Sequence, residues 1–173
     1  MVPGRGVKEL WYRELGASRP RAFVKQMCFY GDLNGHQGCV NTIHFNPAGV
    51  SGSDDKNVIV WNWATKSKEI IYHSGHLDNV FKVRVMPYTD DRTIITSAAD
   101  GQVSVGQIMD NGQVSTRLLG LHNGRVHGLT IEEGAPYVFY SCSEDGLVQQ
   151  FDMRSHAPTK LLLALHSRGI GYL

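Results

Sequence analysis

The sequence predicts an all-β protein built from about three copies of one four-stranded unit. Trp61, Gly106 and Phe151 follow one another at intervals of 45 residues. An aspartate lies six positions before each of them, and a hydroxyl residue lies four positions before each aspartate. A repeat of about 45 residues made of short alternating segments is the period of a propeller blade. The chain is therefore expected to form part of a β-propeller.

Each repeat opens with a histidine, which is followed four, seven and nine residues later by apolar residues. The marker residues form three sets: His36, Ser51, Asp55 and Trp61; His76, Thr96, Asp100 and Gly106; and His122, Ser141, Asp145 and Phe151. These sets divide the chain into repeats at about 33–73, 74–119 and 120–165. Residues 1–32 form an N-terminal segment, and 166–173 a tail without repeat pattern.

Alternating apolar residues and turn sequences place four strands in each repeat. The turns Asp100-Gly101, Asn111-Gly112 and Asp145-Gly146 supply the positive φ that tight hairpins require. We expect strands at 40–45, 50–53, 58–63 and 69–73, then at 80–86, 93–97, 102–108 and 114–119, and finally at 125–131, 137–142, 147–151 and 160–165.

The N-terminal segment has a helical pattern instead. Ser18 precedes Arg19-Pro20, which is typical of a helix cap with proline in the first turn. The next apolar residues share one helical face: Phe23, Val24, Met27 and Tyr30. We expect a short helix at about 21–28. It either packs on the end of the propeller or docks on an adaptor protein.

Composition excludes several classes of protein. The 17 basic and 16 acidic residues nearly cancel, and the basic ones are dispersed, so neither nucleic acid nor a membrane surface is an expected partner. No apolar run approaches the ~20 residues of a membrane helix, and no secretory start is apparent. Cys28, Cys39 and Cys142 are scattered, which argues against a disulfide framework and a zinc site. We expect the nucleus and/or cytoplasm, and no cofactor.

Several segments resemble the WD-repeat family, over about residues 33–165. They are Gly35-His36, Gly75-His76, Ser51-Gly-Ser-Asp-Asp55 and Trp61-Asn62. The resemblance implies that each marker set is a buried structural tetrad, in which the aspartate accepts from the histidine, the hydroxyl bridges, and an indole N–H donates. Such a network fixes strand register by satisfying polar groups that are costly to leave unpaired.

Histidine, serine and aspartate together can also indicate hydrolysis. A catalytic triad, however, appears once, at a cleft, with an exposed nucleophile. Three copies at one spacing indicate a scaffold, so we expect no enzymatic activity. His73 and His76 could suggest a metal, but no third ligand stands at metal spacing, and we expect none.

The repeats also depart from the family pattern. Gly106 and Phe151 replace the tryptophan, and phenylalanine keeps the packing but loses the donor. The second blade is therefore expected to be the least well locked. The interval from histidine to aspartate is 19 residues in the first repeat, against 24 and 23. We expect the missing residues in the second strand of the first blade, near Ala48-Gly49-Val50.

Three repeats are fewer than the four or more blades of a closed propeller. The sequence is therefore interpreted as a truncated form with open sheet edges, which are aggregation-prone unless another chain or further blades cover them.

The third repeat ends in Phe151-Asp152-Met153-Arg154, which resembles the WD-x-Arg box of the DCAF class, the cullin-4-associated WD receptors. Further segments share this resemblance: Asn41-Thr-Ile-His-Phe45, Trp61-Asn-Trp63, Thr96-Ser-Ala-Ala-Asp-Gly-Gln-Val103 and Phe139-Tyr-Ser-Cys142. It implies a substrate receptor in which Arg154 contacts the ligase's propeller adaptor and Asp152 orients that arginine, while a separate protein substrate is recruited. The alternatives are a general interaction scaffold that binds peptides or histones, and a non-functional truncated isoform.

Overall fold

The computed structural model describes residues 31–46, 49–132, 134–155 and 158–163. The chain divides into two units, residues 1–32 and 33–173, and every described strand belongs to the second. The helix expected at 21–28 and the tail expected at 166–173 lie outside the described residues.

The described strands follow the predicted order. The first blade contains β1 (Val40–Phe45), β2 (Gly49–Ser53), β3 (Asn57–Asn62) and β4 (Ser67–His73). The second contains β5 (Val80–Val85), β6 (Thr93–Ala98), β7 (Gln102–Ile108) and β8 (Val114–Leu121). The third contains β9 (Val126–Ile131), β10 (Val138–Ser143), β11 (Leu147–Asp152) and β12 (Thr159–Leu163). Every predicted strand end lies within two residues of the observed one.

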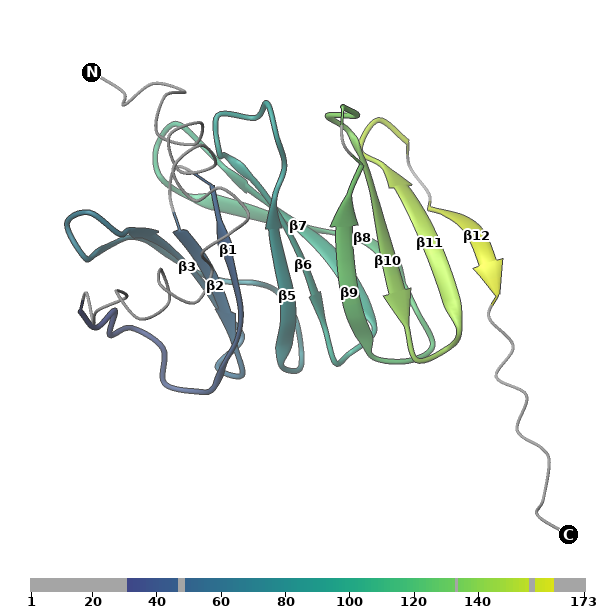
Figure 1. The fold of residues 1–173 in the computed structure, drawn as a ribbon, viewed down its shortest axis with the longest axis horizontal. Coiled ribbons are helices and arrows are strands. Elements are labelled where there is room, and N and C mark those ends of the chain that lie inside the picture. Colours follow the sequence, from purple (N-terminus) through teal and green to yellow (C-terminus); the bar gives the residue numbers. More distant parts are fainter. Residues whose placement is uncertain (1–30, 47–48, 133, 156–157, 164–173) are drawn as a thin grey trace, which may run out of the picture. The chain divides into compact units, whose positions relative to one another are not determined.

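Each blade is a four-stranded antiparallel sheet whose strands pair in chain order (Figure 1). The first strands of neighbouring blades are also neighbours, because β5 contacts β1 and β2 on one side and β9 on the other. The predicted all-β, partial propeller of three four-stranded blades is confirmed. Short hairpins make this sheet order the natural result of the turn sequences, since antiparallel strands need only a few connecting residues.

Two apolar clusters hold neighbouring blades together. The first cluster joins blades one and two and consists of Val50, Val58, Val60, Val83, Val85 and Ile94. The second joins blades two and three and consists of Met86, Ile95, Val103, Val126, Leu129, Phe139 and Phe151. The third strands β3 and β7 are buried on both faces of their sheets, because the four central residues of each strand are buried.

The shortened first repeat has fewer residues between its first two strands than the other repeats have. Three residues, 46–48, connect β1 to β2, whereas seven, 86–92, connect β5 to β6 and six, 132–137, connect β9 to β10. β2 keeps five residues against six in β6 and in β10. Most of the difference therefore lies between the strands, where a shorter connection breaks no ladder hydrogen bonds.

The outer face of the first blade carries exposed apolar side chains. Phe45 is 69% exposed and Ile43 61%, and Val40, Trp63 and Leu33 are also exposed. By contrast, β5, the first strand of blade two, lies between the first strands of its neighbours, and its Val80 and Val83 are fully buried. Blade one therefore presents a surface of the kind that a further blade covers in a propeller.

Candidate functional site

The tetrad of the first blade is complete. His36 Nδ1 lies 3.0 Å from Asp55 Oδ2, and His36 Nε2 lies 2.7 Å from Ser51 Oγ. Trp61 Nε1 donates to the same Ser51 oxygen at 2.7 Å. The four side chains come from the loop before β1, from β2, from the turn after β2 and from β3. Their hydrogen bonds connect the loop before β1 with β2 and β3 in a single network.

The hydrogen bonds of this tetrad have one consistent direction. The backbone amides of Gln37 and Asn57 donate to the Asp55 carboxylate at 2.8 and 2.9 Å. Burial alone raises the pKa of Asp55, but these amides and His36 outweigh it and hold the pKa below its usual value. A carboxylate only accepts, so His36 donates from Nδ1, Ser51 donates to its Nε2, and Trp61 donates to Ser51.

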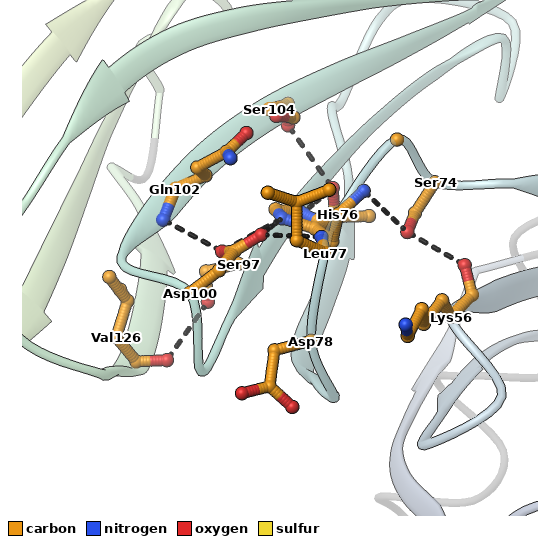
Figure 2. Close-up of polar contacts among 12 residues, drawn as sticks. Lys56, Ser74, His76, Leu77, Asp78, Ser97, Asp100, Gln102, Ser104 and Val126 are labelled. Carbon is orange, nitrogen blue, oxygen red and sulfur yellow. Dashed lines mark hydrogen bonds and ion pairs between the residues drawn. The ribbon is translucent and has the colours of Figure 1, made fainter.

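The second blade keeps three members of the tetrad. His76 Nδ1 lies 3.2 Å from Asp100, and His76 Nε2 lies 2.9 Å from Thr96 Oγ1. The backbone amides of Leu77 and Gln102 donate to Asp100, as Figure 2 shows. Burial lowers the pKa of His76, although Asp100 partly opposes that effect. These two distances are the longest of the three tetrads, since the corresponding distances are 3.0 and 2.7 Å in both the first and the third blade.

A tyrosine from the first blade occupies the space that the missing indole leaves. A Cβ atom placed on Gly106 would lie 2.7 Å from Tyr72 Oη and 3.0 Å from the Tyr72 ring. Tyr72 lies on β4, so the ring crosses from blade one onto blade two. Its hydroxyl is buried and, among the described residues, makes no hydrogen bond. Burial raises the pKa of that hydroxyl. The gap is filled, but the donor is not replaced.

The third tetrad resembles the first except at its aromatic position. His122 lies 3.0 Å from Asp145 and 2.7 Å from Ser141 Oγ. Phe151 stands where the first blade has tryptophan and stacks on Phe139 with 4.7 Å between ring centroids. The backbone amides of Leu147 and Asn123 also donate to Asp145. Burial raises the pKa of Asp145, but these hydrogen bonds outweigh it and lower the pKa, as at Asp55.

The geometry of the three tetrads is structural. Their hydroxyls are nearly inaccessible, with Ser51 3%, Thr96 1% and Ser141 1% exposed. A nucleophile must reach a substrate in a cleft, and these oxygens face the interior of a sheet. Among the described residues, no group of three or more histidine, cysteine, aspartate or glutamate side chains is placed to hold a metal ion. No described helix has the length and apolar character needed to cross a membrane.

The box at the end of the third blade lies on the surface. Asp152 ends β11, and Arg154 follows in the next turn. Arg154 Nε and Nη2 donate to the two carboxylate oxygens of Asp152 at 2.9 and 2.6 Å, and the Arg154 amide donates to Asp152 at 3.0 Å. The guanidinium also lies over the ring of Tyr137, 5.1 Å from its centroid. Asp152 and Tyr137 thus fix the direction of an exposed arginine.

This bound arginine lowers the pKa of Asp152 to about 2, mainly through the side-chain hydrogen bonds and then through the Arg154 amide. The pair is charged at every physiological pH. The corresponding positions of the first and second blades are Ala64 and Met109, so only the third described blade has an arginine there.

Comparisons with known proteins agree with this architecture. Residues 27–62 match the family "WD domain, G-beta repeat". Human WD and tetratricopeptide repeats protein 1 is 36% identical over 138 residues, which are 78% of this chain and 20% of that protein. Human DDB1- and CUL4-associated factor 6 is 32% identical over 138 residues, which are 78% of this chain and 16% of that protein. The crystal structure of the WD40 β-propeller domain of Doa1 matches with a TM-score of 0.60 and 29% identity, over 73% of this chain and 40% of that one.

The fold and the tetrads define a propeller of repeated β-blades, a class that typically serves as a non-enzymatic interaction scaffold. With the family match and these relatives, the chain is a WD40-repeat protein that shares distant homology with the DCAF class. The chain spans about a fifth or less of the length of these curated relatives.

Two residues of the site were not singled out from the sequence. Tyr72 could have been noticed as a large residue on the fourth strand of blade one, but nothing in its neighbours links it to Gly106, 34 positions later. Tyr137 lies 17 positions before Arg154 and meets it only because β10 pairs with β11, with Val138 opposite Asp152.

Proposed function

We propose that this chain acts as the WD-repeat substrate receptor of a cullin-4 RING ubiquitin ligase, binding the ligase's propeller adaptor through Arg154 and recruiting a protein target for ubiquitination. The observation that carries the proposal is the exposed Arg154, braced by Asp152 and Tyr137, at the end of the third blade. A relative whose name associates it with DDB1 and CUL4 supports the same class.

The proposal assigns surfaces and no chemistry to this chain. Its tetrads are buried and hold the blades in register, whereas ubiquitin transfer belongs to the RING subunit and its conjugating enzyme. The exposed cation of Arg154 offers a planar fork of donors that suits a carboxylate on a partner protein. Within the DCAF class, we place the chain nearest to the eighth member on the sequence segments quoted above, with a nuclear and/or cytoplasmic location.

The test is co-purification of the full chain with the cullin-4 adaptor, comparing the wild type with Arg154→Ala. Arg125→Ala is the matched control, because Arg125 is also exposed but precedes β9 at the opposite end of the same blade. We expect binding to be lost in Arg154→Ala and retained in Arg125→Ala, with identical circular dichroism spectra. A folded wild type that does not bind the adaptor would overturn the proposal and favour a general interaction scaffold.

A further inference from the structure

One face of the first blade is open, whereas the same face of the other two blades is covered. Ile43, Val83 and Leu129 are equivalent residues, because each pairs with the hydroxyl residue of its own tetrad. Val83 is fully buried and Leu129 is 5% exposed, since both pack in the apolar clusters that join their blades to the preceding blade. Ile43 is 61% exposed. We call the surface around Ile43 the free face of the first blade.

A hollow of about 120 Å³ lies in this free face. Gly49 and Phe45 pair with each other in its wall. At the position of Gly49, the second and third blades have the buried residues Ile94 and Phe139. Because glycine has no side chain, the space is left open in the first blade. A space of this order takes an aromatic ring, since an apolar cavity of about 150 Å³ binds benzene.

The free face is apolar and its hollow has few ionisable groups. The residues that line the hollow include no aspartate, glutamate, lysine or arginine. Large apolar side chains of the face are exposed by 43, 52, 61, 69 and 51%, and they are Leu33, Val40, Ile43, Phe45 and Trp63. A face of this kind can meet a copy of itself without bringing like charges together, which would be costly.

The area of the free face is sufficient for a specific contact between two copies. An aromatic side chain has a surface of about 150–250 Å², so the five exposed side chains together present on the order of 500 Å². Two such faces would bury about 1,000 Å² in total, which is the size at which interfaces become specific.

The opposite end of the three blades does not offer a matching apolar face. Tyr140 on β10 pairs with Gln150 on β11, and both are partly exposed. Gln150 donates to Tyr140 at 3.4 Å, and Tyr140 donates to the exposed Glu132 at 2.5 Å. The same positions of the first two blades hold buried aliphatic pairs, Val50 with Val60 and Ile95 with Val105. Packing an apolar face here would remove polar groups from water at a cost in free energy. A head-to-tail contact is therefore disfavoured.

We propose that two copies of this chain pair through the free faces of their first blades, with the Phe45 ring of each copy entering the hollow beside Gly49 of the other. The contact is isologous, so the same set of residues is buried on both copies. Phe45 has the largest exposed fraction on this face and lies at the wall of the hollow. The third blade, which carries Arg154, takes no part in the contact, so the inference does not depend on adaptor binding.

The test measures the mass of the full chain by sedimentation equilibrium over a wide range of concentration. We expect the wild type to reach twice the 19.2 kDa of one chain. Phe45→Lys should raise the dissociation constant at least about a hundredfold, because each copy carries the change at the centre of the interface. Ile43→Thr keeps a β-branched side chain in the strand and should raise it roughly tenfold.

Two control variants locate the contact. Leu118→Lys changes a large apolar side chain that is 53% exposed on β8 of the second blade, and it should leave the dimer intact. Gln150→Lys changes the open face of the third blade and should also leave it intact. Circular dichroism and thermal unfolding of dilute, monomeric samples must be the same for Phe45→Lys and the wild type, since Phe45 is exposed in the single chain.

Three results would overturn the proposal. A wild type that stays monomeric at every concentration has no such contact, and if Phe45→Lys then lowers the unfolding temperature, the face is covered within the chain. A dimer that Phe45→Lys leaves intact has its interface elsewhere. A dimer that Gln150→Lys dissociates, or an assembly larger than two chains, uses the third blade and is a head-to-tail contact.

Discussion

Each of the two junctions between neighbouring blades packs one aromatic ring against one glycine, but the two residues come from opposite blades. Between blades one and two, the fourth strand supplies Tyr72 and the third strand of the next blade supplies Gly106. Between blades two and three, the fourth strand supplies Gly120, and a Cβ atom on it would lie 2.8 Å from the ring of Phe151 on the next blade's third strand.

Strand register shows that these positions are equivalent. Tyr72 pairs with Val58, and Gly120 pairs with Val103. The two valines are separated by the 45-residue period, so Tyr72 and Gly120 occupy the same place in successive blades. Each junction therefore holds one aromatic ring against one glycine, and close packing allows the ring to come from either side.

The hydrogen bond does not transfer in the same way. Trp61 both fills its space and donates to Ser51, whereas Tyr72 fills the space beside Gly106 without a partner for its hydroxyl. The aromatic residue of a repeat thus has two separable roles, packing and donation. Packing volume can be supplied by a neighbouring blade, but donation requires an N–H or O–H aimed at one oxygen atom.

The largest effect is expected when the tryptophan of the repeat is restored in the second blade. Gly106→Trp places a side chain where the Tyr72 ring already lies, and overpacking a close-packed junction costs about 3 kcal/mol. The free energy of unfolding should fall by that amount, measured by urea denaturation with circular dichroism.

Gly49→Ala is the control for adding a side chain to a strand glycine, because a Cβ atom there meets nothing closer than 3.8 Å. It should change stability by less than about 1 kcal/mol. Combining Gly106→Trp with Tyr72→Ala should restore much of the loss, giving a coupling energy above about 1 kcal/mol. Additive effects in this double-mutant cycle would show that the two positions do not share one space.

A smaller loss is expected when the donor of the complete tetrad is removed. Trp61→Phe keeps a ring but deletes the N–H that Ser51 accepts, which should cost about 1–2 kcal/mol in unfolding free energy. Trp63→Phe, on an exposed residue two positions away, is the matched change and should cost less. Equal losses from the two substitutions would mean that the indole of Trp61 contributes through its size alone.

Much of this architecture could be predicted from the sequence, because period and turn residues act locally. Asp100-Gly101 and Asp145-Gly146 mark hairpins, and both glycines have positive φ, at 82° and 78°. The tetrad members follow from the same period, since a fixed interval of four strands returns each residue to the same place in its blade. The tetrads of the first and third blades differ only in the aromatic residue, Trp61 or Phe151, which the sequence already displays.

The rest depends on contacts between blades, which a single repeat does not encode. The shortened first repeat was expected to lose part of its second strand, yet most of the missing residues fall between β1 and β2. Tyr72 meets Gly106 across one junction, and Arg117 lines a small pocket with Asp152 and Met153 across the next. In each case the partners lie on different sheets, so their proximity follows from packing and not from spacing.

As the pH falls, the fold is expected to lose stability through two histidines, His76 and His44, before it does so through the aspartates. The pKa of His76 is lowered by burial, and that of His44 by burial and by Arg84, against a weaker opposing effect of Asp91. As the pH falls below about 6.5, these histidines bind protons in the unfolded chain but less readily in the native one. The free energy of unfolding therefore decreases with decreasing pH. Above that pH the contribution is complete.

The measurement is the thermal unfolding midpoint between pH 7.5 and 5. His44→Gln removes one of the two titrating groups and keeps an acceptor for the Val85 amide, which donates to His44 Nδ1 at 3.2 Å. This variant should lose less stability over the range than the wild type. A separate decrease, below about pH 4, is expected from Asp55 and Asp145, whose lowered pKa values stabilise the fold only while they are ionised. A midpoint that stays constant from pH 7.5 to 5 would contradict the histidine effect.

The smallest effect has the opposite sign. Tyr72→Phe deletes a buried hydroxyl that has no partner in the described part of the chain, and it keeps the ring against Gly106. Leaving a buried polar group unpaired costs free energy, so its removal should stabilise the protein by up to about 1 kcal/mol. The same kind of change, the loss of one aromatic donor, thus destabilises blade one at Trp61 and stabilises the junction at Tyr72. If Tyr72→Phe instead lowers the urea midpoint, the hydroxyl has a hydrogen-bond partner in solution, and the stabilisation expected here is wrong.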